Sequence, residues 1–208
     1  MNVFFRTTVF VLLITALLLP PLTRSEVKEN TITIDATNQE DFAFFSFDTG
    51  EVVTVKDQNV SLDWDLGLKR TEVIVNGGSS GNGKGGAIVL EKANFSEITE
   101  APVDGYVADT EKIATLARGD GWYNYTGPPR HQILIRDKVL ILQTAKGHYT
   151  KMFFVGYYKD NEAKDSGHIT ITYAYQDDGS RNFIQAKKTS VNSKGKLAST
   201  WADLKTQS

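Results

Sequence analysis

The chain has 208 residues, of which 40% are apolar and 23% are charged, so it is long and apolar enough to form a hydrophobic core. Its 23 Lys and Arg residues nearly balance its 25 Asp and Glu residues, and this balance gives no indication of a nucleic-acid partner. The sequence contains no Cys, which excludes disulfides, thiol catalysis, thiolate metal sites and the lipid-anchored Cys of bacterial lipoproteins.

Residues 1–25 have the layout of a secretory signal peptide. Arg6 supplies a positive charge, an apolar run from Val9 to Leu19 follows, and Thr23-Arg24-Ser25 resembles a cleavage site. The run is short for a membrane span, which needs about 20 apolar residues. We therefore expect cleavage near Ser25 and export, to the periplasm or outside the cell, without a stable transmembrane segment. Three sequons matter only if the source glycosylates asparagine: Asn59, Asn94 and Asn124.

The remainder of the chain consists mainly of predicted β-strands separated by turn signals. Alternating polar and apolar residues predict the first strand at 31–35. Further strands are predicted at 42–47, 52–55, 62–69, 71–75, 87–90, 112–116, 122–125, 131–144, 149–158 and 168–176. The run 131–144 is expected to be two strands joined at Arg136-Asp137-Lys138, because strands are typically about five or six residues long.

This spacing predicts an all-β domain over residues 26–180, mainly an antiparallel sheet or sandwich with little helix. Residues 181–208 are expected to be a C-terminal extension, with one short helix at 197–204.

Two sequence features permit a functional interpretation that we do not favour. Asp63 and Asp65 lie two positions apart on a predicted strand and could bind a cation, but we interpret them as the solvated face of that strand. The glycine-rich stretch 76–86 partly matches a phosphate-binding loop, yet Gly85 stands where Ser or Thr should hold magnesium. A predicted strand follows it instead of a helix, so we interpret this stretch as a structural loop.

The strongest candidate binding residues gather between 122 and 131. Trp122, Tyr123 and Tyr125 could form an aromatic wall for a flat ligand, and His131 begins a strand directly after a turn that ends at Arg130. The alternative for these aromatic residues is ordinary core and rim packing. No nucleophile or acid–base constellation suggests an enzyme, and the close histidine spacings of zinc enzymes are missing.

Several ordered motifs carry a resemblance to a known family. They are Thr33-Ile34-Asp35-Ala36, Phe45-Ser46-Phe47, Gly50-Glu51-Val52-Val53, Trp64-Asp65, Gly83-Lys84-Gly85-Gly86-Ala87, Asp104-Gly105-Tyr106, and Ile169-Thr170 with Tyr173 and Tyr175. In these motifs, over about residues 31–176, the chain resembles the HmuY-like bacterial haem-binding proteins, which are haemophores of all-β fold.

The resemblance implies a secreted, non-catalytic protein that captures haem and iron for uptake. An outer-membrane haem receptor or a host haem protein would be its partner. The family holds haem between two axial histidines, or two methionines in some members. The segment that carries the first ligand is shortened here, across 107–121, and the second ligand position falls at Tyr125-Thr126-Gly127.

His131 is therefore the leading axial-ligand candidate, and His148, Met152 and the tyrosines near Trp122 are further possible donors. Arg130 is the expected partner of the haem propionates. The competing hypothesis is a secreted binding or adhesion module that has kept the fold and lost haem, because neither family ligand stands in its expected place.

Overall fold

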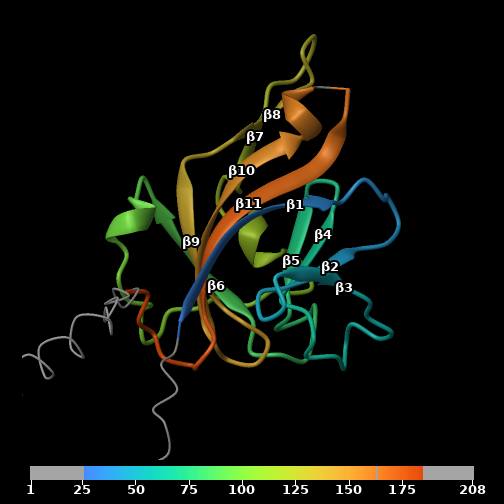
Figure 1. The fold of residues 1–208 in the computed structure, drawn as a ribbon. Coiled ribbons are helices and arrows are strands. Elements are labelled where there is room, and N and C mark those ends of the chain that lie inside the picture. The colour runs from blue at the N-terminus through green and yellow to red at the C-terminus, as the bar shows by residue number, and fades with distance from the viewer. Residues whose placement is uncertain (1–25, 163, 185–208) are drawn as a thin grey trace, which may run out of the picture.

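Two antiparallel sheets and a separate hairpin make up the regular structure (Figure 1). The computed structural model describes residues 26–162 and 164–184, so the predicted signal peptide and the predicted helix at 197–204 lie outside the described residues. The strands are β1 (Val27–Asp35), β2 (Ala43–Ser46), β3 (Glu51–Val53), β4 (Leu66–Lys69), β5 (Glu72–Val75), β6 (Gly86–Glu91), β7 (Tyr123–Tyr125), β8 (Ile133–Ile135), β9 (Lys138–Gln143), β10 (Tyr149–Tyr158) and β11 (Ser166–Gln176). Three short 3-10 helices complete the set: η1 (Phe95–Glu97), η2 (Thr115–Ala117) and η3 (Lys159–Asn161).

The larger sheet has five strands in the order β1-β11-β10-β9-β6, and the smaller has four in the order β3-β2-β4-β5. Strands β7 and β8 pair only with each other. All named pairings are antiparallel, which confirms the predicted fold class.

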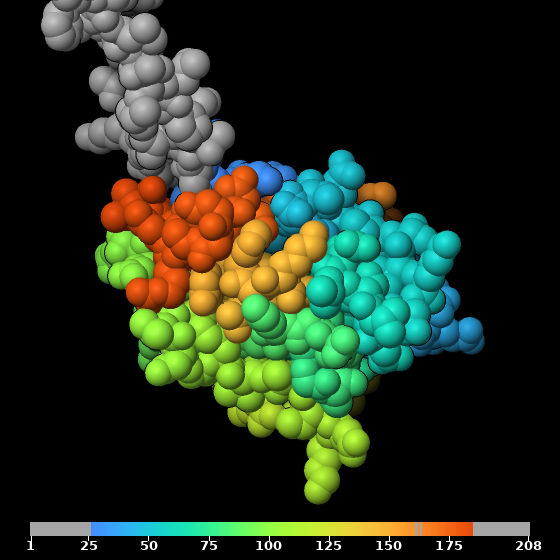
Figure 2. Space-filling view, turned by 90° about the horizontal axis from the view of Figure 1, so that it is seen from below, coloured from blue at the N-terminus to red at the C-terminus, as the bar shows by residue number. Residues whose placement is uncertain are grey.

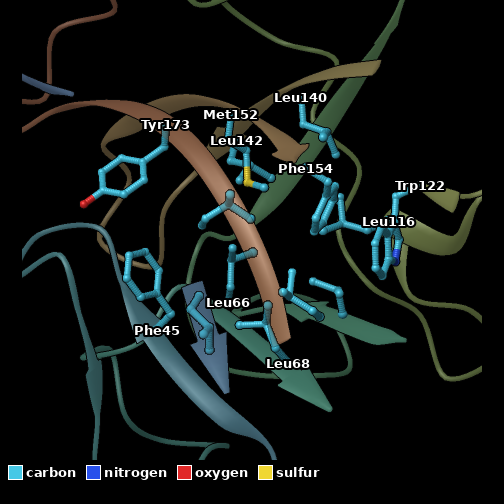
Figure 3. Packing of buried hydrophobic residues seen from close by; sticks show 14 of the residues in the cluster. Phe45, Leu66, Leu68, Leu116, Trp122, Leu140, Leu142, Met152, Phe154 and Tyr173 are labelled. Atoms are coloured by element: carbon cyan, nitrogen blue, oxygen red, sulfur yellow. The ribbon is translucent and has the colours of Figure 1, made fainter. Parts of the chain in front are cut away.

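The main core lies between the two sheets (Figure 3). Along β11 the inward-facing residues are Ile169, Ile171, Tyr173 and Tyr175, as the period-two pattern of a strand requires. They pack with residues of the smaller sheet such as Phe45. A second cluster covers the opposite face of the five-stranded sheet and includes Phe183, so the described fold continues to residue 184.

The structure corrects two predicted strands. Only Leu66–Lys69 of the predicted strand 62–69 enters a sheet, and Leu62 is 42% exposed. The predicted strand 112–116 is wrong, because this segment forms a turn followed by η2. The reason is that the carboxylate of Asp109 accepts a hydrogen bond from the Thr115 N–H at 2.6 Å, which withdraws that donor from any strand ladder. The break between β8 and β9 is confirmed.

The interpretation of Asp65 as a solvated residue is also wrong. Its carboxylate is buried and accepts hydrogen bonds from the N–H groups of Phe47 at 2.8 Å and Ala145 at 2.9 Å. The alternation of polar and apolar residues does not predict this burial, because Asp65 precedes the hydrogen-bond ladder of β4. Its carboxylate instead accepts hydrogen bonds from backbone N–H groups that belong to both sheets. Asp63 remains exposed, as predicted.

The glycine-rich stretch is a structural loop, as predicted, and β6 rather than a helix follows it. It is wrapped around Asn76, whose side-chain amide donates to the carbonyls of Ser61 and Trp64 and accepts from the Gly83 N–H. A Cβ at Gly77 would lie 2.0 Å from the Gly85 carbonyl oxygen, so glycine is required for this close approach. Figure 2 shows this end of the molecule, with the β9–β10 turn in gold beside the segment after β11 in red-orange.

Candidate functional site: the β7–β8 hairpin and its groove

The β7–β8 hairpin lies at the end of β10 that is remote from the β9–β10 turn (Figure 1). The N–H of Ile133 donates to the hydroxyl of Tyr158, the last residue of β10, at 2.7 Å. The connection 126–132 reverses through Gly127 and His131, which have φ values of +66° and +50°. This connection returns the chain so that residues on either side of it come together.

Tyr125 and His131 are the two predicted site residues that touch across this hairpin. The phenol oxygen of Tyr125 and Nδ1 of His131 are hydrogen-bonded, and the two ring centroids are 5.9 Å apart. Both residues are exposed, Tyr125 by 56%. A phenol oxygen and an imidazole nitrogen, both of which are ligand atoms for iron, therefore lie together at an accessible position.

Trp122 and Tyr123 form the base of the same hairpin. Trp122 is only 3% exposed, stacks on Phe154 with ring centroids 4.3 Å apart, and donates from Nε1 to the Thr71 carbonyl at 3.2 Å (Figure 3). Tyr123 packs edge-on against Trp122 and is half-buried. For Trp122 the alternative of core packing is thus correct, and this packing fixes the base of the hairpin to the main core.

A groove of about 300 Å³ adjoins this base, at the lower end of the range for small-molecule sites. It lies between the edge strand β5 and the segment from η2 to β7. Its lining residues are Thr71, Glu72, Val73, Ala114, Ala117, Gly119, Asp120, Gly121, Trp122 and Tyr123. Tyr123 and Tyr125 are two positions apart in β7 and so share one face of the strand, which places Tyr125 next to the groove wall.

The two acidic groups of the groove are neutralised by neighbours. Glu72 forms an ion pair with Lys69 at 3.3 Å. Asp120 pairs with Arg136 at 2.5 Å and also with Lys138, and the hydrogen bond from Lys138 is the main cause of a lowered pKa at Asp120. Negative charge in the groove is therefore compensated.

Arg118 supplies a cationic group beside the groove. It lies between Ala117 and Gly119, which both line the groove. In the part of the chain that the structure describes, its Nε is a buried side-chain nitrogen with no hydrogen-bond partner. A buried donor without a partner is costly, and the positive charge of Arg118 partly offsets the rise that burial causes in the pKa of the Asp109 carboxyl. Arg130 is exposed and precedes His131 in the hairpin connection.

His148 lies at the other end of β10 and has a structural environment. Its Nδ1 and the Tyr175 hydroxyl are hydrogen-bonded at 2.8 Å, and the two rings stack with centroids 6.1 Å apart. The ten residues of β10 separate His148 from the hairpin, a distance of about 30 Å at the usual rise of roughly 3.3 Å per residue. His131 and His148 therefore cannot bind one iron atom together in this fold.

Met152 is 0% exposed and packs inside the main core (Figure 3). The structure therefore brings Tyr125 together with His131, and Trp122 together with Tyr123, but it separates these residues from His148 and Met152.

Sequence reasoning missed Arg118 and the groove. The small residues on either side of it, in Ala117-Arg118-Gly119-Asp120-Gly121, were a signal of a tight loop. The sequence gives no indication, however, that this loop faces the edge of β5 about 45 residues earlier.

Within residues 26–162 and 164–184, the structure contains no group of three or more His, Cys, Asp or Glu residues that could hold a bare metal ion. In the same ranges, no helix is long and apolar enough to cross a membrane.

Comparison with one solved structure supports the fold. The chain is similar in structure to the apo HmuY analogue of Tannerella forsythia, with a TM-score of 0.55, 19% identity, and coverage of 73% of this chain and 97% of that one. It also matches a candidate HmuY-like haem-binding protein from Bacteroides vulgatus, with a TM-score of 0.48, 25% identity, and coverage of 70% and 90%. A candidate lipoprotein from Bacteroides fragilis gives 0.49, 19%, and coverage of 70% and 88%.

No curated protein matches the sequence. The model of the HmuY protein family, however, matches residues 38–173, which is more than half of the chain and includes the smaller sheet, the hairpin and the larger sheet apart from β1 and the end of β11. The chain therefore belongs to the HmuY family.

Proposed function

We propose that this protein is a secreted, non-catalytic haem-binding protein that captures haem iron for uptake, and that the haem is held at the β7–β8 hairpin and its groove. The observation that carries the proposal is the pairing of Tyr125 with His131 beside the groove wall. Membership of the HmuY family supports it. An outer-membrane haem receptor and a host haem protein are the proposed partners for delivery and supply.

The residues at this site fit a haem group. Phenol oxygen and imidazole nitrogen are both known axial donors to haem iron. The groove offers aromatic surface from the half-buried Tyr123, and the buried side chains of Trp122 and Val73 form its floor. Haem also carries two propionates, and arginine is the side chain best suited to pair with a carboxylate. Arg130, which is exposed, and Arg118, which lies beside the groove in sequence, are the proposed propionate partners.

Bound haem supplies the iron that an uptake function requires. The residues of this chain bind and orient it. Tyr125 and His131 provide the iron donor, while the anchoring of Trp122 to Phe154 and Thr71 keeps the hairpin in place. The buried carboxylates of Asp65 and Asp109 accept backbone hydrogen bonds and so serve the fold, which agrees with a non-catalytic role.

Absorbance titration with hemin tests this proposal. We expect a saturable change in the Soret band with one haem per chain. In the double variant Tyr125→Phe/His131→Ala the affinity should fall by at least about tenfold. The variant Tyr149→Phe/His168→Ala is a matched control, because it removes the same groups elsewhere and should bind as the wild type does. No saturable change with the wild type would overturn the proposal and favour the binding module that has lost haem.

A further inference from the structure

We infer that the phenol oxygen of Tyr125 is the axial ligand to ferric haem iron, and that His131 is a positioning residue that holds this oxygen in place. The inference rests on the proposed function and specifies which of the two paired groups binds iron. It differs from the expectation that the imidazole of His131 is the leading ligand.

The backbone favours Tyr125 for this role. Tyr125 pairs with Ile133 in the β7–β8 ladder and faces the same side as Tyr123, which lines the groove. His131 lies beyond the ladder, in the connection, with φ at +50°. The phenol is thus held by regular structure next to the groove, and the imidazole is held only by the turn.

Exposure distinguishes Tyr125 from the other tyrosines of the chain. All eight tyrosines of the sequence fall within the described residues, and Tyr125 is the only one of them that is exposed. Tyr158 is close to the hairpin, but its hydroxyl already accepts the hydrogen bond from the Ile133 N–H. A ligand that approaches the hairpin end from solvent therefore meets the hydroxyl of Tyr125.

The contact with His131 gives the phenol the partner that iron binding requires. When the imidazole carries its proton on Nε2, Nδ1 is an acceptor and the Tyr125 hydroxyl donates to it. Binding of the phenol oxygen to ferric iron would release the phenol proton, either along this hydrogen bond or to water, and no electron would be transferred.

This ligand sets a preference between oxidation states. A phenolate is a hard, anionic donor that stabilises ferric iron more than ferrous iron, since ligand charge and softness govern metal preference. The site should therefore hold ferric haem and bind it less tightly once the iron is reduced. The chemical class of ligand is thus a ferric porphyrin.

Resonance Raman and absorption spectra of the hemin complex test the inference, with hemin as the probe. We expect phenolate vibrations and a high-spin ferric spectrum in the wild type. Tyr125→Phe should abolish these vibrations and weaken binding by at least about tenfold. His131→Ala should keep them while weakening binding roughly 10- to 100-fold, as expected for a group that orients a ligand. His131→Gln should recover part of the loss, because its carbonyl can still accept the phenol hydrogen bond.

The controls separate this inference from the proposed function. Tyr125→Phe removes one exposed hydroxyl, so its fold is expected to match the wild type by circular dichroism. Tyr149→Phe is the matched loss of a phenol elsewhere and should keep the wild-type spectrum. If Tyr125→Phe keeps the wild-type spectrum while His131→Ala changes it, the inference is overturned and haem binding stands. If the wild type binds no hemin, both are overturned. Ferrous haem bound as tightly as ferric haem would also contradict the inference.

Discussion

The carboxylate of Asp65 accepts a hydrogen bond from the backbone N–H of Ala145, 80 residues later in the chain, at 2.9 Å. Its second oxygen accepts from the Phe47 N–H at 2.8 Å. Phe47 directly follows β2 of the smaller sheet, and Ala145 lies in the β9–β10 turn of the larger one. One buried carboxylate thus fastens the two sheets together at the end opposite the hairpin.

Replacing Asp65 by Asn should destabilise the protein. An amide side chain has one acceptor oxygen, so it cannot accept from both backbone N–H groups, and its NH₂ would face one of them. We expect the free energy of unfolding in urea to fall by about 1–3 kcal/mol. The matched variant Asp63→Asn changes an exposed residue and should stay within about 0.5 kcal/mol of the wild type. Equal effects of the two substitutions would show that the bonds of Asp65 contribute little.

The same residue should make stability depend on pH. Burial raises the pKa of Asp65 above its ordinary value of 3.8, so in the window between the two values the folded state binds a proton that the unfolded state has lost. Stability therefore decreases as pH rises through this window, and the full cost of burying the charge is present above the raised pKa.

Urea unfolding at several pH values from about 4 to 7 measures this dependence. The decline in stability should be shallower in Asp65→Asn, which has no proton to lose. Asp35 has a pKa lowered by its hydrogen bond with Thr37. The stability that ionised Asp35 contributes is therefore lost at pH values below this window. Parallel curves for the wild type and Asp65→Asn would contradict the assignment.

The fold could be predicted from sequence wherever alternation and turn residues determined it. The predicted strand at 168–176 lies within β11, and Arg136-Asp137-Lys138 marked the break between β8 and β9. Asp65 and Thr115 could not be predicted in this way. Asp65 is fixed by a hydrogen bond from Ala145, which is distant in the sequence. Thr115 is fixed by a hydrogen bond to the carboxylate of Asp109. Neither hydrogen bond produces a periodic pattern in the sequence.

Gly77→Ala should be strongly destabilising if the glycine-rich stretch is a structural loop. A Cβ at this position would lie 2.0 Å from the backbone oxygen of Gly85, which cannot move away as the end of a flexible side chain could. We expect a loss of at least about 2 kcal/mol in the free energy of unfolding. Gly156→Ala is the control, because a Cβ there meets nothing within 4 Å and should change stability by less than about 1 kcal/mol. A fully stable Gly77→Ala would contradict the packed loop.

His148→Ala should affect stability and leave hemin binding unchanged. The substitution removes the partner of the Tyr175 hydroxyl, which belongs to a residue only 1% exposed, and should cost about 1–2 kcal/mol. Because this residue lies at the opposite end of β10 from the hairpin, the hemin titration curve should match that of the wild type. A folded His148→Ala protein with lost hemin affinity would place the site at the β9–β10 turn instead.

The candidate site could be predicted only in part. Trp122, Tyr123, Tyr125 and His131 are close in sequence, so a single hairpin was enough to gather them. The separation of His131 from His148 could not be foreseen, because it follows from the direction and length of β10. The groove depends on β5 and η2, which meet only through the tertiary fold.

Paramagnetic broadening of backbone amide NMR signals by bound hemin tests the central claim, that haem binds at the hairpin. Ferric iron broadens the signals of amides close to it, so the affected residues locate the iron. We predict that broadening centres on Tyr125 and His131 and extends to the groove residues Trp122 and Ala117, while His148 and Ala145 keep sharp signals. Broadening centred on His148, or no broadening at saturating hemin, would contradict the account.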